Sequence, residues 1–353
     1  MQVYGSSKFA LFPDHIAALR EGRLIPPVHV RIKPINNCNH ACWYCAYRAD
    51  NLALGEDMNE ADRIPEQKMR EIVDDLIGMG VKAVTFSGGG EPLLYKTLPD
   101  HIQKLAEGGI KVASLTNGAN LKGRMADAFA EYGTWVRVSV DAWDDESYAA
   151  SRGIKPGAYS SLIRNLTDFA KRDSGCVLGV SFIVDERNCG HIADACAQLA
   201  DAGVSHVKLS AAVVSNDVHE NNVYHRRLAG IVAAEIDQAR KLENASFRIV
   251  DHYHEMNERF EKAYPSCAFM QFLTVIGADC NVYACQDKAY TESGKLGSIS
   301  DISFREFWES PALKKRMKKL DPRRDCRHHC VTHAKNNALY EMLQLDPAHV
   351  PFV

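Results

Sequence analysis

Apolar runs of strand length alternate with amphipathic segments of helix length through the first two thirds of the chain. Six predicted strands cover residues 28–35, 81–87, 110–116, 135–141, 176–184 and 206–211. The clearest predicted helix follows Pro65, with one apolar face formed by Met69, Ile72, Val73, Leu76 and Ile77. Strands that alternate with helices of about 10 to 15 residues are typical of parallel βαβ units. We therefore expect an α/β fold, a partial TIM-like (β/α)6 barrel whose sites lie at the C-terminal ends of the strands.

The C-terminal third has a different pattern. A long helix is predicted at 217–244 and a strand at 247–254. Two apolar runs, 269–276 and 282–285, flank a turn at 277–281 and predict a β-hairpin. Because 353 residues exceed what one hydrophobic core usually serves, we expect more than one domain. The predicted divisions are a lead-in at 1–27, the barrel at 28–245, a small domain at 246–335 and a tail at 336–353.

Composition narrows the class of protein. Hydrophobic residues make up 46% of the chain and charged residues 25%, as in ordinary globular proteins. A net charge of -3 gives no case for a nucleic-acid or membrane partner, and no apolar run is long enough to span a bilayer. The N-terminus lacks the basic and apolar regions of a secretory signal. Eleven cysteines without such a signal favour metal or redox use in a reducing compartment, so we expect a cytoplasmic protein.

Three of the cysteines, Cys38, Cys42 and Cys45, form a C-x3-C-x2-C pattern directly after the first predicted strand. They supply three thiolates to one side of a metal centre, with no fourth ligand nearby. Iron–sulfur clusters prefer thiolate ligands, and a [4Fe–4S] cluster held by three cysteines keeps one iron open. A zinc site would need four ligands, and His40 lies awkwardly inside the x3 segment.

Polar motifs also follow the next three predicted strands. Gly88, Gly89, Gly90, Glu91 and Pro92 come after the second strand. Asn117 comes after the third, while Ser139 and Asp141 end the fourth. All of these groups, like the cysteine loop, fall at the same end of the predicted barrel. That common end is where the chemistry of such a barrel is expected.

The cysteine pattern, with Tyr44 just before its last member, resembles the signature of the radical S-adenosylmethionine (SAM) superfamily. The resemblance covers about residues 28–335. It implies a [4Fe–4S] cluster whose open iron chelates the amino and carboxylate groups of SAM. An electron then cleaves SAM to a 5′-deoxyadenosyl radical, which abstracts hydrogen from substrate. A reducing donor such as flavodoxin or ferredoxin is implied as a partner.

The same resemblance assigns the cofactor-binding residues. Gly88 to Pro92 contain the Gly-Gly-Glu-Pro form of the motif that binds the methionine amino group. Ser139, Asp141 and Arg152 correspond to residues that contact the ribose and the carboxylate, and Tyr44 and Val184 to residues near adenine. Two alternatives stay open: Arg152 forming a surface ion pair, and Asn117 serving only an Asn-Gly turn.

A second cysteine set lies in the C-terminal third. The predicted hairpin brings Cys267 and Cys285 together at its open end, and Cys326 and Cys330 supply a second pair. Four thiolates complete a closed cluster site. The segment resembles the SPASM/twitch extension of radical SAM enzymes, in its shorter twitch form with one auxiliary [4Fe–4S] cluster. Cys280 is an additional candidate ligand, and zinc is the structural alternative.

A radical generator beside a second cluster implies net oxidation, a dehydrogenation of a small polar or carbohydrate-like substrate. Epimerisation is an alternative, with Cys189 as candidate hydrogen donor. Peptide or protein maturation is another, weakened because only some 27 residues precede the barrel. A non-enzymatic iron–sulfur sensor is the alternative from another class, and it would leave the Gly-Gly-Glu-Pro motif without a purpose.

Overall fold

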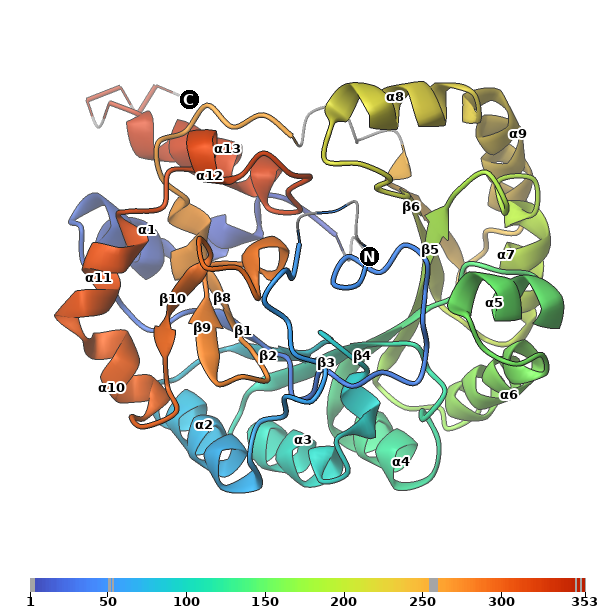
Figure 1. Cartoon of the computed structure of the whole chain (residues 1–353), viewed down its shortest axis with the longest axis horizontal. Helices are drawn as coiled ribbons and strands as arrows, with labels where there is room; N and C mark the ends of the chain where they lie inside the picture. Colours follow the sequence, from blue (N-terminus) through green and yellow to red (C-terminus); the bar gives the residue numbers. More distant parts are fainter. Residues whose placement is uncertain are drawn as a thin grey trace.

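One sheet forms the framework of the molecule (Figure 1). The computed structural model describes residues 4–49, 52, 54–253, 260–346, 348–349 and 351–352. In these residues the strand order is β10-β9-β8-β1-β2-β3-β4-β5-β6-β7. The strands are β1 (His29–Ile32), β2 (Ala83–Phe86), β3 (Lys111–Thr116), β4 (Gly133–Ser139), β5 (Val177–Val184), β6 (His206–Ala211), β7 (Arg248–Asp251), β8 (Leu273–Ile276), β9 (Asn281–Tyr283) and β10 (Lys295–Ser298).

Helices cover the outer side of this curved sheet (Figure 1). The helices are α1 (Pro13–Arg20), α2 (Glu66–Gly78), α3 (Leu98–Glu107), α4 (Gly123–Tyr132), α5 (Asp145–Arg152), α6 (Ala158–Ala170), α7 (Ile192–Asp201), α8 (Val218–Arg226), α9 (Ala229–Arg240), α10 (Phe304–Glu309), α11 (Pro311–Met317), α12 (Pro322–Asp325) and α13 (His333–Gln344). Strands β1 to β7 are parallel, and the α/β, partial-barrel prediction is confirmed.

The sheet extends beyond the six predicted strands at both ends. Strand β7 pairs in parallel with β6, and the hairpin strand β8 pairs in parallel with β1. The hairpin itself, β8 with β9, is antiparallel as its turn pattern predicts. The small C-terminal segment is therefore joined to the barrel by backbone hydrogen bonds, and does not form a sheet of its own.

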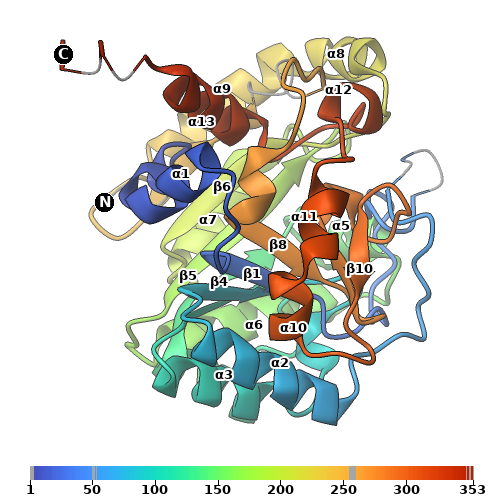
Figure 2. The same ribbon diagram turned by 90° about the vertical axis from the view of Figure 1, so that its left-hand side faces the viewer.

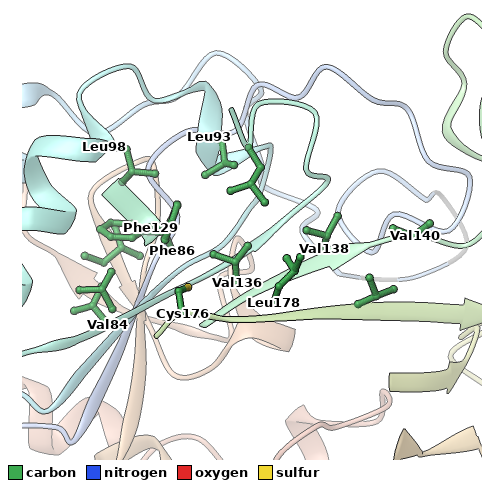
Figure 3. Close-up of a cluster of buried hydrophobic side chains, with 14 of the residues drawn as sticks. Val84, Phe86, Leu93, Leu98, Phe129, Val136, Val138, Val140, Cys176 and Leu178 are labelled. Carbon is green, nitrogen blue, oxygen red and sulfur yellow. The ribbon is translucent and has the colours of Figure 1, made fainter. Parts of the chain in front are cut away.

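The main hydrophobic core lies between the sheet and its helices (Figure 3). Apolar residues on one face of each strand are buried there because side chains alternate between the two faces. Examples are Val84, Phe86, Val136, Val138 and Leu178, which pack near Leu98 and Phe129. The helix predicted after Pro65 is α2, and Met69, Ile72, Val73 and Leu76 are its buried residues.

The opposite face of the same strands carries polar side chains. Ser139 is paired in register with Ser181, and Ser181 with Lys208, so the three form a row across β4, β5 and β6. On β1, Arg31 and Lys33 flank the buried Ile32. A strand buried on both faces usually reads as continuously apolar, so this polar inner face marks a functional interior.

The long helix predicted at 217–244 is two helices, α8 and α9, which meet at residues 227–228. Helix α8 is tied to the end of β6, because Asn221 accepts from the Val214 amide and the His225 ring contacts the Ala212 carbonyl. Helix α9 packs instead against α7 and β7. Helices α8 and α9 thus contact different elements, which accounts for the break between them.

Helices α1 and α13 lie side by side on one side of the barrel (Figure 2). Phe9 and Ile16 from the lead-in pack with Phe272 and with Leu339 of α13 in a separate apolar cluster. Residues predicted as a tail therefore belong to a packed helix. Within the described residues, no helix combines the length and apolar character needed to cross a bilayer.

Candidate functional site

A cavity of about 430 Å³ opens at the C-terminal ends of the parallel strands. The three-cysteine loop lines one side of it, together with Gly88, Gly89, Gly90 and Glu91. Strands β4 to β6 line the floor through Ser139, Ser181 and Lys208. Residues next to the second cysteine set, such as Gln286 and His329, line the remaining side. Elements far apart in the sequence therefore share one enclosed space.

Cys38, Cys42 and Cys45 all line the cavity as half-buried free thiols. Burial raises the pKa of Cys38 to about 11, and it also raises the pKa of Cys45. Such thiols stay protonated at neutral pH unless a metal replaces the proton. The donor set is three sulfurs facing an open space, which fits the three-cysteine cluster predicted from the spacing.

A buried ion pair between Arg152 and Asp141 supports the three-cysteine loop. The Arg152 guanidinium pairs with the buried Asp141 carboxylate and donates to the Cys42 sulfur at 3.2 Å. Asp141 also accepts from the Tyr44 hydroxyl and from the Ile183 amide, the latter at 2.6 Å. Burial opposes the charge on Arg152, but Asp141 together with Tyr44, Cys42 and Tyr148 outweighs it and holds the pKa of Arg152 well above its ordinary value. Arg152 is thus a buried partner of the loop and not a surface ion pair.

The glycine run is packed against the base of the cysteine loop. A Cβ at Gly90 would lie 2.0 Å from the Asn37 carbonyl oxygen, and one at Gly88 would lie 1.6 Å from the Gly90 carbonyl oxygen. Neighbouring backbone atoms therefore leave no room for a side chain at Gly88 or Gly90. The run fixes the distance between the loop and Glu91.

Glu91 is buried and its carboxylate is oriented by three donors. Oε1 accepts from the Thr116 hydroxyl at 2.5 Å and the Leu93 amide at 3.0 Å, and Oε2 accepts from the Asn117 amide at 2.8 Å. Burial raises the pKa of Glu91, partly offset by these donors. Oε2 keeps acceptor capacity for an ammonium group. Pro92 begins the short 3₁₀ helix Pro92–Leu94, which Glu91 caps.

Asn117 forms the predicted turn and also lines the cavity. Its Oδ1 accepts from the Ala119 amide and closes a turn at Gly118, whose φ is +77°. Its Nδ2 donates to Asn39 in the cysteine loop at 2.8 Å, and the residue lines the cavity.

The interior contains buried polar atoms that lack a protein partner, among them His40 Nδ1, Ser87 Oγ and Arg152 Nε. All three residues line the cavity. Buried polar groups are normally hydrogen-bonded, so these atoms are consistent with a polar ligand such as SAM.

Four residues predicted for this site do not line the cavity, namely Pro92, Asp141, Val184 and Cys189. Val184 is fully buried in the main core, while its neighbour Ile183 lines the cavity, because alternate residues of a strand face opposite sides. Cys189 is buried in the same core, and its thiol donates to the Glu186 carbonyl at 3.7 Å. Cys189 therefore does not reach the cavity, where a hydrogen donor for epimerisation would have to lie.

The second cysteine set gathers around a small closed pocket. Cys267, Cys285, Cys326 and Cys330 all line it, and Leu320 and Pro322 cover it. Burial and the neighbouring Asp287 carboxylate raise the pKa of Cys285, and burial raises that of Cys326 to about 12. Mutual repulsion of four thiolates is relieved when they bind a cationic centre.

Cys280 lies elsewhere, in the hairpin turn, with φ of +56°. Its nearest charges are Asp279 and Lys68, and it is not among the residues that line the four-cysteine pocket. The left-handed backbone there is the conformation that glycine favours. Among the described residues, no three His, Cys, Asp or Glu side chains converge on a point suited to a single metal ion.

Sequence reasoning missed the residues that connect the two cysteine sites. Lys33 donates to the Tyr47 hydroxyl at 2.7 Å and to the Gly88 carbonyl at 2.5 Å. The Tyr47 hydroxyl donates in turn to the Gln286 carbonyl, beside Cys285, at 2.9 Å. The available signal was Lys33 directly after β1, on the same side of the chain as Arg31. His252, within the predicted strand 247–254, also lines the cavity.

Comparison with known proteins agrees with this geometry. Residues 32–185 match the Radical SAM superfamily, and residues 267–331 match the SPASM iron–sulfur cluster-binding domain. The Fe-coproporphyrin III synthase of Methanosarcina barkeri is 29% identical over 152 residues, 43% of this chain and 35% of that protein. The GTP 3′,8-cyclase of Xanthomonas campestris pv. campestris is 33% identical over 147 residues, 40% of this chain and 42% of that protein. The matched segments thus span less than half the length of these relatives.

Solved structures share the fold over most of the chain. Streptococcus suis SuiB bound to precursor peptide SuiA superposes with a TM-score of 0.62 at 16% identity, covering 94% of this chain and 78% of that one. The two matched domains imply [4Fe–4S] clusters and SAM as cofactors, as predicted. The chain therefore contains a radical SAM domain at residues 32–185 and a SPASM iron–sulfur cluster-binding domain at residues 267–331.

Proposed function

We propose that the chain is a radical SAM oxidoreductase that abstracts hydrogen from a small polar or carbohydrate-like substrate and oxidises it overall. One observation carries the proposal: a single cavity is lined both by Cys38, Cys42 and Cys45 and by Gln286 and Asp287 beside Cys285. A substrate in this space contacts both cysteine-rich regions. That placement suits an oxidation in which hydrogen and an electron leave in separate steps.

The residues that would hold the cofactors follow from the site. Cys38, Cys42 and Cys45 would hold the SAM-binding cluster, and the second set, Cys267, Cys285, Cys326 and Cys330, would hold the auxiliary one. When bound, these groups supply a 5′-deoxyadenosyl radical and a nearby one-electron acceptor. Glu91 would bind the ammonium group of SAM, because its carboxylate is already oriented by three donors.

The protein also fixes geometry and limits water. The Tyr44 and Arg152 contacts with Asp141 hold the loop against β4. Leu52 and Leu54 add apolar lining on the loop side of the cavity. A preorganised, enclosed site protects a reactive species from side reactions.

The test is anaerobic reconstitution followed by incubation with SAM and a strong reductant. We expect 5′-deoxyadenosine, and about eight iron atoms per chain if both sites hold four-iron clusters. Absence of 5′-deoxyadenosine from protein with an intact cluster spectrum would contradict the proposal. About four iron atoms and one zinc would assign the second site to zinc.

A peptide substrate is the second candidate, favoured by the similarity of fold to a protein solved with its precursor peptide. Epimerisation receives less support, because Cys189 is buried in the core away from the cavity. Analysis of the reaction products distinguishes peptide modification and epimerisation from oxidation of a small molecule. An oxidised small molecule, a modified peptide and an inverted stereocentre differ in mass or in deuterium uptake.

A further inference from the structure

A strongly basic segment lies over the second cysteine set. Residues 311–327, which include α11 and α12, contain eight Lys or Arg residues and two Asp residues, a net charge of +6 in a chain whose net charge is -3. The basic residues are Lys314, Lys315, Arg316, Lys318, Lys319, Arg323, Arg324 and Arg327. Helix α10, directly before the segment, has one basic and two acidic residues, so the positive charge begins at α11.

The charged side chains of this basic segment face solvent because its large apolar residues face inward. Leu313, Met317 and Leu320 recur at helical spacing and are buried in the main core. Seven of the eight basic residues are exposed, and Arg316 is half-buried. Helix α11 packs against β10 at the edge of the sheet, and Figure 2 shows it on the side that faces the viewer.

Most of this positive charge is not neutralised locally. Three of the basic residues have acidic partners, in the pairs Arg316–Glu292, Arg323–Asp321 and Arg324–Asp325. In the part of the chain that the structure describes, no carboxylate forms an ion pair with the other five, Lys314, Lys315, Lys318, Lys319 and Arg327. Five exposed cations therefore remain for a negatively charged partner.

The inner side of the basic segment encloses the four-cysteine pocket. Leu320 and Pro322, which cover that pocket, lie between Lys319 and Arg323 in the sequence. Cys326, one of the four cysteines, belongs to the segment itself. A protein bound to the basic surface would therefore lie next to the residues that enclose the second cysteine set.

The composition of the surface favours an acidic protein over a nucleic acid or a membrane. Residues 311–327 contain no Phe, Tyr or Trp, the side chains on which single-stranded bases stack. Their large apolar residues are buried, so no apolar face is left to enter a bilayer.

The proposed reaction also needs a protein that exchanges single electrons. Cleavage of SAM takes in one electron, and oxidation of the substrate radical releases one electron and a proton. A carrier that donates the first electron in its reduced form can accept the second in its oxidised form, so the electrons balance over a turnover. A partner of this class suits a surface beside a second redox centre.

We propose, resting on the function proposed above, that the exposed basic surface of residues 314–327 is the docking site of a small acidic one-electron carrier protein. Complementary charge steers such a partner to the surface and orients it there. None of the basic residues of the segment lines the substrate cavity, so docking leaves the cavity free for substrate.

The experiment measures binding of two acidic carriers, a flavodoxin and a [2Fe–2S] ferredoxin, to the reconstituted chain by biolayer interferometry at about 20 and about 200 mM NaCl. We expect at least one carrier to bind at low salt, and Lys318→Glu combined with Lys319→Glu to weaken that binding at least about tenfold. Lys318→Arg combined with Lys319→Arg keeps the charge and should stay within about threefold. Lys111→Glu combined with Lys171→Glu, two exposed lysines outside the segment, is the matched control.

Each outcome decides the question. Absence of binding by both carriers, binding that does not weaken at the higher salt concentration, or an equal loss in the Lys318/Lys319 reversal and in its control would overturn the proposal. Tighter binding of single-stranded RNA or of anionic lipid vesicles than of either carrier would assign the surface to another class of partner and would overturn it too.

Two further measurements keep the test decisive. If the Lys318/Lys319 reversal fails to fold, Lys314→Glu combined with Lys315→Glu replaces it, with the same loss expected and no loss contradictory. Formation of 5′-deoxyadenosine with dithionite as the reductant is followed in parallel and needs no carrier. Failure of the radical chemistry is therefore seen separately from failure of docking.

Discussion

The two cysteine-rich regions of this molecule contrast in openness. The three-cysteine loop lies on the wall of a cavity of about 430 Å³, and the Cys42 sulfur accepts a hydrogen bond from Arg152. The four-cysteine set surrounds a small pocket that Leu320 and Pro322 cover. A centre with a free coordination position needs room for a ligand, whereas a fully ligated centre can be enclosed. The difference in surroundings therefore matches the difference in ligand number.

Removing a ligand from the open site should have the largest effect. Cys42→Ala leaves two thiolates, and we expect 5′-deoxyadenosine to fall below detection with a loss of about four iron atoms per chain. Product chromatography and iron analysis measure this. Unchanged product formation would show that the loop does not hold the reactive centre. Cys196→Ala, on the buried face of α7, is the control that should keep both product formation and iron content.

Removing a ligand from the four-cysteine site should lower the iron content without abolishing SAM cleavage. Cys285→Ser is expected to lose about half of the iron while SAM cleavage without substrate persists, because the open site stays intact. Cys280→Ser is the matched variant in the same hairpin and should keep all of the iron. The assignment fails if the two variants exchange these outcomes.

Breaking the ion pair beneath the open site should destabilise the fold. Arg152→Met leaves the Asp141 carboxylate buried without its counterion, at an expected cost of about 3–5 kcal/mol in unfolding free energy. Chemical denaturation measures it, and titration should show weaker SAM binding. Arg172→Met breaks the more exposed pair with Asp127, and less than about 1 kcal/mol is expected there. Equal costs for both pairs would mean that the buried network has no special role.

The glycine contact with the cysteine loop should tolerate no added carbon. Gly90→Ala places a Cβ against the Asn37 carbonyl, with an expected loss of about 1–3 kcal/mol. Gly190→Ala is the control, because a Cβ there meets nothing within 4 Å. Thermal unfolding compares the two variants. A neutral Gly90→Ala would indicate that the loop can move away from the strand.

The smallest effect is expected at the connection between the sites. Tyr47→Phe removes the hydroxyl that joins Lys33 to the Gln286 carbonyl, and about 1 kcal/mol of stability should be lost. Denaturant midpoints measure the change. Lys33→Met should cost more, because the Tyr47 hydroxyl and the Gly88 carbonyl both lose their partner. A larger loss of stability in Tyr47→Phe than in Lys33→Met would mean that Tyr47 contributes more than Lys33 to the connection between the two cysteine sites.

Much of the framework could be predicted from the chain because it depends on local pattern. The predicted strand 206–211 is β6, and the hairpin follows from a polar turn between two apolar runs. The pairing of β8 with β1 could not be predicted, since neither strand carries a mark of its distant partner. The break between α8 and α9 likewise depends on contacts of Asn221 and His225 with another element.

In the site, too, local sequence pattern predicts some features, while others depend on distant contacts. Cysteine spacing identified both cysteine sets, but a choice between Cys280 and Cys285 needed the hairpin geometry. Val184 and Ile183 are adjacent on β5 and face opposite sides of the sheet, and the sequence alone does not show which of the two faces the cavity. Lys208 carries no motif at all, and only the register across β5 and β6 reveals its position.

The parallel pairing of β8 with β1 has a consequence for solubility. Without the C-terminal segment, β1 would be an unprotected edge whose amides and carbonyls could template pairing with another molecule. The hairpin that presents Cys285 covers that edge, and the edge passes to β10, a strand of four residues whose pairing with β9 is irregular. Short, irregular edges discourage intermolecular association. The segment that supplies the second cysteine set thereby also guards the barrel against aggregation.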